Sequence, residues 1–357
     1  MRTVSSTRIL RVGSAQKLQN FFAESLSPTR RIQAQTQLRD MTAPAKPRPS
    51  ASILLVSPAN EVLLLHRVQT SSAFPSAHVF PGGNLSRFHE SGHVELEDPL
   101  AQGDSPEFRA AAIRETFEES GILLAVDAAA RGGRPVELTA AQRDAGRRAV
   151  HANEVTLSRW LEGVGGVPDL QGLRPFTRWI TPGNVPRRFN TQMYLYMLPL
   201  SSGTATDRNV VPATSDGGLE HTEAVFAPPR TWLERARRGD IVMFPPQVYL
   251  LSLVAEHLQP LNTDSSSSLE TRQQRRESLL RFVQETPSDG VAWADKVISP
   301  SFMGPVDKGG GGDDRIVLGL SRPRGDPDRV VYVKLEKGGS RFGEVRMHPQ
   351  RSTTGKL

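Results

Sequence analysis

One segment, R-E-T-F-E-E-S-G-I at residues 114–122, constrains this chain more than any other. It ends a stretch with apolar residues at helical spacing that Gly121 stops, so we expect a helix from about residue 106. On that helix Glu115, Glu118 and Glu119 stand at i, i+3 and i+4, which places three carboxylates on one face. Such carboxylates repel one another unless a hard divalent cation, Mg²⁺ or Mn²⁺, binds them. The alternative is a solvated acidic helix face.

The segment resembles the second half of the Nudix box, G-x5-E-x7-R-E-U-x-E-E-x-G-U, in which U is a bulky apolar residue. The F-P-G-G at residues 80–83 resembles the beginning of that box. This resemblance implies an α/β fold, the Nudix α/β/α sandwich with a mixed β-sheet, and hydrolysis of a phosphoanhydride (pyrophosphate) bond. It implies Glu115, Glu118 and Glu119 as metal ligands, and Arg114 with Glu118 and Glu119 as catalytic residues.

The box is interrupted in this chain. Gly83 and Arg114 are 31 positions apart where the pattern has 14, an insertion of 17 residues. Counting back from Arg114 places the first Glu of the box at Pro106, with Glu107 one residue away. We expect that Glu to be structural and not a metal ligand.

The interruption and three further segments resemble the acyl-coenzyme A diphosphatase branch, the Nudix type 19 or testosterone-regulated group. The segments are A-H-V-F-P-G-G, R-W-I-T-P and P-R-R-F-N-T, at residues 77–83, 178–182 and 186–191. Asn190 stands where the branch usually has Asp. The resemblance covers about residues 50–260 and implies coenzyme A or acyl-CoA as substrate, giving 3′,5′-ADP and (acyl-)4′-phosphopantetheine.

The remaining site residues are expected around this core. Arg187 and Arg188 are neighbours, so on a strand only one faces inward, where a guanidinium can bind phosphate. We expect substrate contacts from a set of glycines and arginines: Arg67, Gly82, Gly83, Arg187 and Arg188. The resemblance implies a general base near the strand that follows the substrate strands, which makes Glu223 or Glu220 the candidate.

A second motif, H-E-S-G-H at residues 89–93, satisfies the H-E-x-x-H pattern of zinc metalloproteases. Zinc binding there needs a stable helix that places both histidines on one face. Ser91-Gly92 at its centre disfavours a helix. We expect a polar insertion loop instead.

Three other functions stay open. The first is a Nudix hydrolase of ADP-ribose, NADH or capped RNA. The second is a non-catalytic Nudix module that binds a partner, against which the three intact carboxylates argue. The third is a mitochondrial RNA-associated protein led by a basic tail. The sequence leaves the oligomeric state open.

Charge argues against a stable nucleic-acid complex. The net charge is +6, but residues 1–50 alone carry nine Lys/Arg and two acids, so the remainder is close to neutral. The absence of cysteine excludes disulfides, Cys-based zinc sites and thiol nucleophiles. No run of about 20 apolar residues predicts a membrane span.

The chain divides into three predicted parts. Residues 1–50 are a targeting segment and linker, residues 51–260 the Nudix domain, and residues 261–357 a C-terminal extension with Ser-rich and Gly-rich linkers. The acid-poor, Arg- and Ser-rich start is typical of a mitochondrial transit peptide. The final Gly355-Lys356-Leu357 resembles the peroxisomal tripeptide S-K-L, which makes the peroxisome the alternative.

Strands and helices are predicted from hydrophobic periodicity and turn residues. We expect a hairpin over 53–57 and 62–67, and strands at 177–181, 192–200, 223–227, 316–320 and 330–335. Helices are expected at 139–163, 230–238 and 246–257, with a charged, solvated helix or coil around 270–277.

Overall fold

Two runs of buried aliphatic residues form the centre of the protein. They are strand β1 (Arg48–Val56) and strand β2 (Val62–Arg67), joined by the turn that the sequence predicts and paired antiparallel at Val56 and Val62. The computed structural model describes residues 44–67, 76–93, 97–130, 133–200, 221–259, 268–306, 315–336 and 339–347. From Lys46 onward the chain forms one compact unit.

Within the described residues, β1 and β2 belong to a nine-stranded sheet of order β13-β10-β7-β8-β1-β2-β3, in which β4 also pairs with β1 and β9 with β2. The β1–β8 and β7–β10 pairs are parallel and the other pairs antiparallel, so the sheet is mixed, as expected. The further strands are β3 (His78–Val79), β4 (Gly82–Asn84), β7 (Arg174–Ile180), β8 (Phe189–Met197), β9 (His221–Ala227), β10 (Val297–Ile298) and β13 (Pro323–Arg324).

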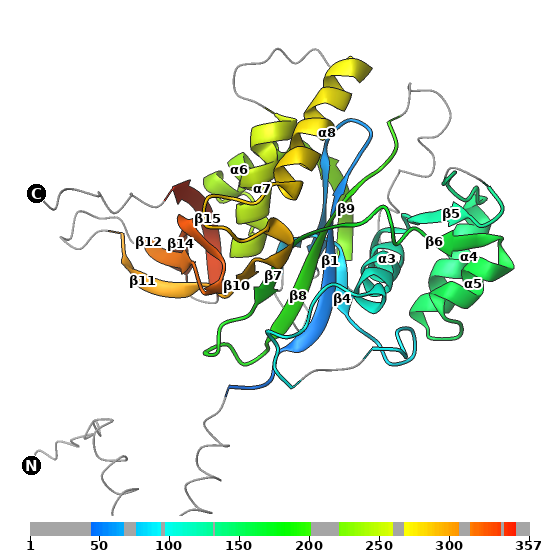
Figure 1. Ribbon diagram of the computed structural model, residues 1–357, viewed down its shortest axis with the longest axis horizontal. Coiled ribbons are helices and arrows are strands. Elements are labelled where there is room, and N and C mark those ends of the chain that lie inside the picture. The colour runs from blue at the N-terminus through cyan, green and yellow to red at the C-terminus, as the bar shows by residue number, and fades with distance from the viewer. Residues whose placement is uncertain are drawn as a thin grey trace, which may run out of the picture. The chain divides into compact units, whose positions relative to one another are not determined.

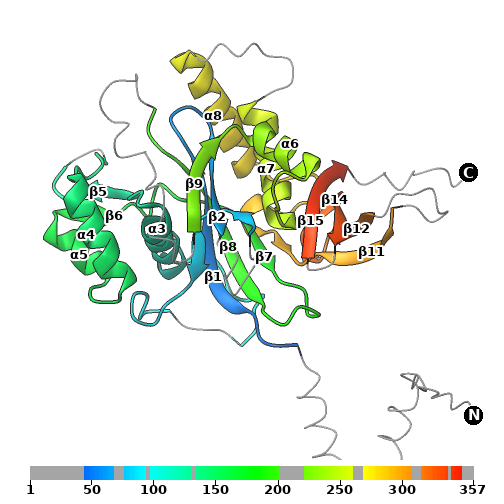
Figure 2. The same cartoon turned by 180° about the vertical axis from the view of Figure 1, so that it is seen from behind.

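Helices cover both faces of this sheet (Figures 1 and 2). Side chains alternate along a strand, so Ile53 and Leu55 of β1 pack on one side while Leu54 and Val56 pack on the other. The first face is covered by α3 (Pro106–Ser120) and the second by α6 (Pro229–Arg238), α7 (Pro245–Leu258) and α8 (Leu269–Gln284). This arrangement confirms the α/β/α sandwich.

A small lobe follows α3. The two-stranded sheet of β5 (Ala125–Asp127) and β6 (Gly166–Pro168) accompanies α4 (Ala140–His151) and α5 (Leu157–Gly163). The expectation of a single helix over 139–163 was wrong. Asn153 takes a left-handed conformation (φ 56°), and the Thr156 side chain caps a new helix by accepting from the Arg159 N–H.

The segment behind residue 260 contributes directly to the sheet. Strand β10 pairs with β7, and β13 pairs with β10, after the 3₁₀ turn η2 (Trp293–Asp295). A second sheet has the order β11-β12-β14-β15, with β11 (Ser301–Pro305), β12 (Arg315–Leu320), β14 (Asp326–Glu336) and β15 (Gly339–Met347). The residues expected as an extension therefore lie in the same compact unit as the predicted Nudix domain.

A charged, solvated helix or coil was expected around residues 270–277, but helix α8 is partly buried. Arg276 is buried and donates to Asn60 Oδ1, Ser57 O and Leu198 O at 2.6–2.7 Å, which ties α8 to the β1–β2 turn. The predicted targeting segment, the Ser-rich and Gly-rich linkers and the C-terminal tripeptide lie outside the described residues. None of the described helices is long and apolar enough to span a membrane.

Candidate active site

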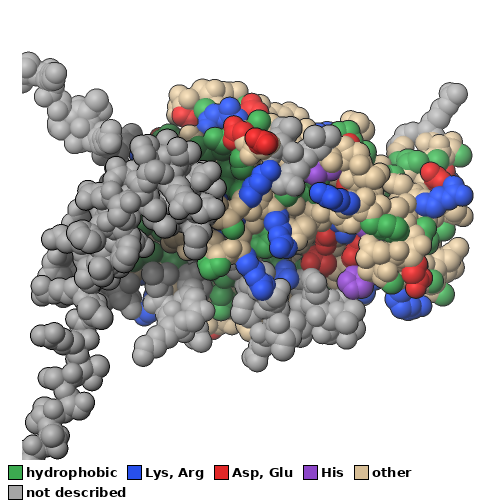
Figure 3. Space-filling model, turned by 90° about the horizontal axis from the view of Figure 1, so that it is seen from below, with side chains coloured by type: hydrophobic (Ala, Val, Ile, Leu, Met, Phe, Trp, Pro, Cys, Tyr) green, Lys and Arg blue, Asp and Glu red, His purple; other side chains and the backbone are tan. Residues whose placement is uncertain are grey.

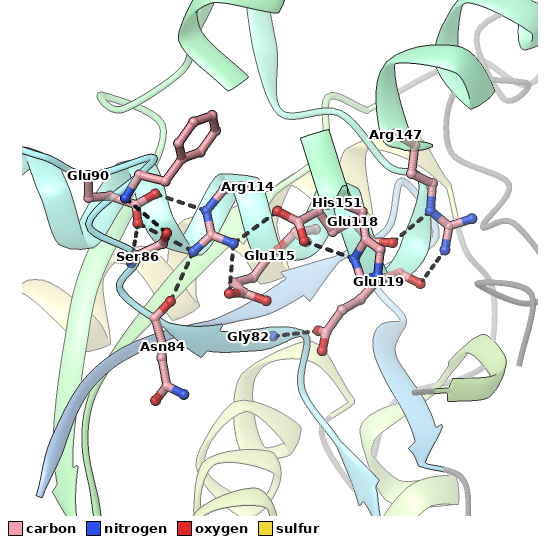
Figure 4. A network of polar contacts seen from close by, with 12 residues as sticks. Gly82, Asn84, Ser86, Glu90, Arg114, Glu115, Glu118, Glu119, Arg147 and His151 are labelled. Atoms are coloured by element: carbon pink, nitrogen blue, oxygen red, sulfur yellow. Dashed lines mark hydrogen bonds and ion pairs between the residues drawn. The ribbon is translucent and has the colours of Figure 1, made fainter. Parts of the chain in front are cut away.

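Helix α3 carries the acidic segment, and both of its ends are defined by sequence. Ser105 precedes it in an extended conformation, Pro106 opens it, and Gly121 ends it in a left-handed conformation (φ 73°). Phe108 and Phe117 are buried toward the sheet. Glu115 and Glu119 consequently lie against β4, while Glu118 is turned toward Arg114 and α4 (Figure 4).

Two glycines allow β4 to approach these carboxylates. The Gly82 N–H donates to Glu119 Oε2 at 2.8 Å. A Cβ at Gly82 would lie 2.4 Å from the carbonyl oxygen of Ala51, and one at Gly83 would lie 2.4 Å from the carboxyl carbon of Glu115. Only glycine fits at either position without displacing a neighbour.

Arg114 is the centre of the polar network in Figure 4. Its buried guanidinium donates to Glu115 Oε1 at 2.8 Å, Glu118 Oε1 at 2.9 Å, Glu90 Oε1 at 2.9 Å and the Asn84 carbonyl at 2.9 Å. Burial by itself lowers its pKa, but the surrounding carboxylates outweigh burial and raise it, so Arg114 stays charged. The structure thus brings Arg114 together with the predicted metal ligands.

Glu90 is the partner of Arg114 that the sequence reasoning missed. Its carboxylate is buried, binds Arg114 and also accepts the Ser86 N–H at 2.7 Å. The box count points instead to Pro106 or Glu107, but Pro106 opens α3 and Glu107 accepts a hydrogen bond from Ser105 Oγ. Counting forward from Gly83 would have placed the residue at position 89, beside Glu90, so the inserted residues come after it.

The same glutamate lies inside the H-E-x-x-H motif, which forms turns and no helix. His89 interacts electrostatically with Arg114, while His93 stacks edge-on against Phe108 and contacts Gln102. Glu90 is therefore committed to Arg114. The local structure lacks the helix that a zinc metalloprotease motif requires.

The insertion is held against the same face of the sheet. Asn190, buried on β8, donates to Pro99 O at 2.9 Å and to Gln102 Oε1 at 3.3 Å. Tyr194 on the same strand donates to Asp104 Oδ1 at 2.7 Å. These contacts place the polar insertion beside α3.

The acidic face carries more negative charge than its environment favours. Burial raises the pKa of Glu115 to about 7, and the Glu118 carboxylate adds to this effect, while Arg114 opposes it. Seen from below, a group of acidic side chains lies with a histidine beside it and basic side chains nearby (Figure 3). Such a face is suited to a cation or to a group that carries one.

Helix α4 also contacts α3, and no motif in the sequence predicts this contact. Arg147 Nε and Nη2 donate to Glu118 O and Glu119 O at 2.7 and 3.0 Å. His151 Nδ1 lies 3.2 Å from Glu118 Oε2. The acidic segment is therefore bounded by Arg114 on one side and by α4 on the other.

The chemistry of the donor set fits a hard divalent cation, because Glu115, Glu118 and Glu119 offer only carboxylate oxygens. In the part of the chain that the structure describes, no three acidic or His side chains are already gathered as metal ligands. Arg114 Nη1 contacts both Glu115 and Glu118, and Glu119 is turned to Gly82. A cation would compete with Arg114 for two of the three carboxylates.

The structure does not bring Glu223 to this cluster. Glu223 is exposed on β9, where it pairs with His66 of β2. On β2, His66 lies two positions from Leu64, so both side chains are on the same face. Leu64 packs on the side of Trp232 in α6, so by strand alternation Glu223 faces away from α3. This placement does not support the expected role of Glu223 as general base, and Glu220 lies outside the described residues.

The predicted arginines lie on two other segments. Arg187 is exposed and Arg188 donates to Thr181 O at 3.0 Å, both in the β7–β8 connection. Arg67 ends β2, where its N–H donates to Ala77 O. Their part in substrate binding stays a prediction.

Residues 88–254 match the family model described as the NUDT19 Nudix domain. The chain is 31% identical over 243 residues to a Xenopus laevis protein named acyl-coenzyme A diphosphatase NUDT19, covering 57% of this chain and 61% of that protein. A Gallus gallus protein of the same name is 31% identical over 239 residues, covering 54% and 60%. The chain thus spans about three fifths of these relatives.

Among solved structures, the chain is similar to a NUDIX hydrolase from Alicyclobacillus acidocaldarius. The two share 25% sequence identity with a TM-score of 0.46, over 58% of this chain and 90% of that one.

Proposed function

We propose that this chain, which belongs to the Nudix hydrolases through a domain of the NUDT19 type, hydrolyses the diphosphate bond of coenzyme A or an acyl-CoA. The observation that carries the proposal is the acidic face of α3 held against the Gly82-Gly83 turn by Arg114. The names of the two vertebrate relatives support the substrate.

Each residue of the cluster has a defined part in the proposal. Glu115, Glu118 and Glu119 would hold Mg²⁺ or Mn²⁺, which, when bound, neutralises the diphosphate oxygens and activates water. Arg114 limits the rotation of Glu115 and Glu118, and the Gly82 N–H fixes Glu119. Glu90 keeps Arg114 in place.

The reaction adds one water to one phosphoanhydride. The water oxygen bonds to a phosphorus atom, the bridging P–O bond breaks, and the bridging oxygen leaves with the other phosphate. The products are 3′,5′-ADP and (acyl-)4′-phosphopantetheine. Because Glu223 faces away, the water proton passes to a carboxylate of the α3 face.

A substrate panel tests this function. Purified full-length chain is incubated with Mg²⁺ or Mn²⁺ and separately with CoA, an acyl-CoA, ADP-ribose, NADH and capped RNA, and products are identified by mass. We expect the highest kcat/KM for CoA or acyl-CoA, and no turnover after metal chelation. Preference for another member of the panel would replace the substrate and keep the reaction class.

For location, we propose the mitochondrion, with the peroxisome as alternative, from the acid-poor basic start and the final tripeptide. Imaging a carboxy-terminal fluorescent fusion, which masks the tripeptide, beside an amino-terminal fusion separates the two. Mitochondrial signal is expected from the first. A cytosolic first fusion with a peroxisomal second fusion would reverse the assignment.

A further inference from the structure

Helix α4 contacts the acidic face of α3 through two side chains one helical turn apart. Arg147 donates to the carbonyls of Glu118 and Glu119, and His151 donates to the Glu118 carboxylate. Figure 4 shows both side chains pointing from α4 toward the last turn of α3. Neither residue belongs to the Nudix box.

The contacts of Arg147 follow from the way a helix ends. The last four carbonyls of a helix have no intrahelical donor, and the end carries partial negative charge. Glu118 and Glu119 lie in the last turn of α3, which ends at Ser120. Arg147 supplies a charged donor to both carbonyls, and this fixes the backbone from which two of the proposed metal ligands extend.

His151 adds a second hydrogen-bond donor to the Glu118 carboxylate. Arg114 binds Oε1 of Glu118 at 2.9 Å and His151 binds Oε2 at 3.2 Å. The two donors come from different elements on opposite sides of the carboxylate. Rotation of Glu118 about its last bond would break both contacts.

The lobe that carries these donors is itself fixed to α3. A capping box between Thr139 and Gln142 begins α4, and Gly146 lets the helix pack directly on Trp160 of α5, where any Cβ would collide. Trp160 stacks on Phe117 of α3 with ring centroids 5.1 Å apart. Arg147 and His151 are therefore presented from a packed element.

We propose that Arg147 and His151 are positioning residues that orient Glu118 and Glu119 for the metal ion. The proposal rests on the proposed function, since it assumes that these carboxylates bind the cation. Partners that hydrogen-bond to metal ligands fix their orientation, and their loss typically weakens metal binding by about 10- to 100-fold. This gives the α4 lobe a role in the site.

Mn²⁺ binding to the full-length chain, followed by electron paramagnetic resonance without substrate, tests the proposal. Arg147→Met and His151→Leu should each weaken Mn²⁺ binding about 10-fold. His151→Asn keeps an N–H at the position of Nδ1, so it should stay within about threefold of the parent. Arg148→Met on the same helix is the matched control, because Arg148 is exposed, and it should bind as the parent does.

Circular dichroism melting shows that each variant is folded. Parent-like Mn²⁺ binding by both His151→Leu and Arg147→Met would overturn the positioning role while the proposed function stands. His151→Asn binding as weakly as His151→Leu would also overturn it. If Glu118→Gln binds Mn²⁺ as tightly as the parent, the metal site itself is elsewhere and both proposals fail.

Discussion

Glu90 shows at the scale of one residue how the site holds its charges. Glu90 and Arg114 are both buried, and their closest atoms are 2.9 Å apart. Glu90→Gln keeps the shape but removes the charge, so we expect it to lower the free energy of unfolding by about 1–3 kcal/mol. Glu107→Gln, the position expected from the box count, should change it by less than about 0.5 kcal/mol.

Urea unfolding of both variants measures the difference, and diphosphatase assays should show the greater loss for Glu90→Gln. A larger loss of stability for Glu107→Gln than for Glu90→Gln would mean that Glu107 holds the site.

The two glycines of β4 are expected to respond differently to the same substitution. An added Cβ at Gly82 meets the Ala51 backbone, which cannot move aside, so Gly82→Ala should destabilise the fold by about 1–3 kcal/mol. At Gly83 the three atoms nearest to the Cβ all belong to the Glu115 carboxylate, which can rotate away. Gly83→Ala should therefore reduce metal-dependent turnover more than stability. Melting temperatures and kcat of the two variants measure this difference. If the two substitutions lower stability and turnover equally, the prediction is contradicted.

Strand β3 carries a buried histidine, His78. His78 is buried between His66 and Trp232, and in the described structure its Nδ1 has no hydrogen-bond partner. Burial, with smaller contributions from the charges of His66 and Arg235, lowers the pKa of His78 to about 3. The unfolded chain, with a pKa near 6.5, binds a proton between these values that the folded chain excludes.

Stability should therefore rise with pH across this window, and fall as pH drops below about 6.5. From pH 7 to pH 5 the contribution of His78 is a loss of about 2 kcal/mol. His78→Phe keeps a ring against His66 without titrating, so its unfolding free energy should fall less over that range. Parallel pH profiles for parent and variant would contradict the assignment.

At the scale of helices and strands, periodicity and turn residues were enough to predict most elements but not the contacts between them. Helix α3 corresponds to apolar and acidic residues at helical spacing. Strands β7, β8 and β9 correspond to short segments rich in apolar residues. The break between α4 and α5 depends on Asn153 in a left-handed conformation. The pairing of Glu90 with Arg114, which lie 24 positions apart in the sequence, has no periodic signal at all.

On the scale of the whole molecule, the chain behind residue 260 is expected to be required for folding. It supplies buried members of the core on the α7 side of the sheet, including Leu279, Trp293, Ile298 and Val331. Burying such a side chain contributes about 1.5–3 kcal/mol to stability. A chain ending at residue 259 should therefore lose more stabilisation than the whole free energy of unfolding of a typical domain. Cooperative melting of that truncated chain, followed by circular dichroism, would contradict this.

At this scale, the α/β/α sandwich was expected from the resemblance to the Nudix box, and the acidic helix from apolar residues at helical spacing before Gly121. Local sequence patterns do not show that β10 and β13 extend the same sheet, because β10 pairs with β7 more than 100 residues earlier in the chain and β13 joins the sheet only through β10. Glu223 was misplaced for a related reason, since a strand's register decides which face a side chain takes.

We propose that the α3 carboxylates drive hydrolysis of a diphosphate bond. The most direct test incubates the purified full-length chain with CoA and Mg²⁺ and quantifies 3′,5′-ADP, beside Glu118→Gln, Glu119→Gln and the double variant. We expect turnover by the parent and a loss of about 100-fold or more in each variant, because each removes a proposed metal ligand. Full activity of the double variant would contradict the account.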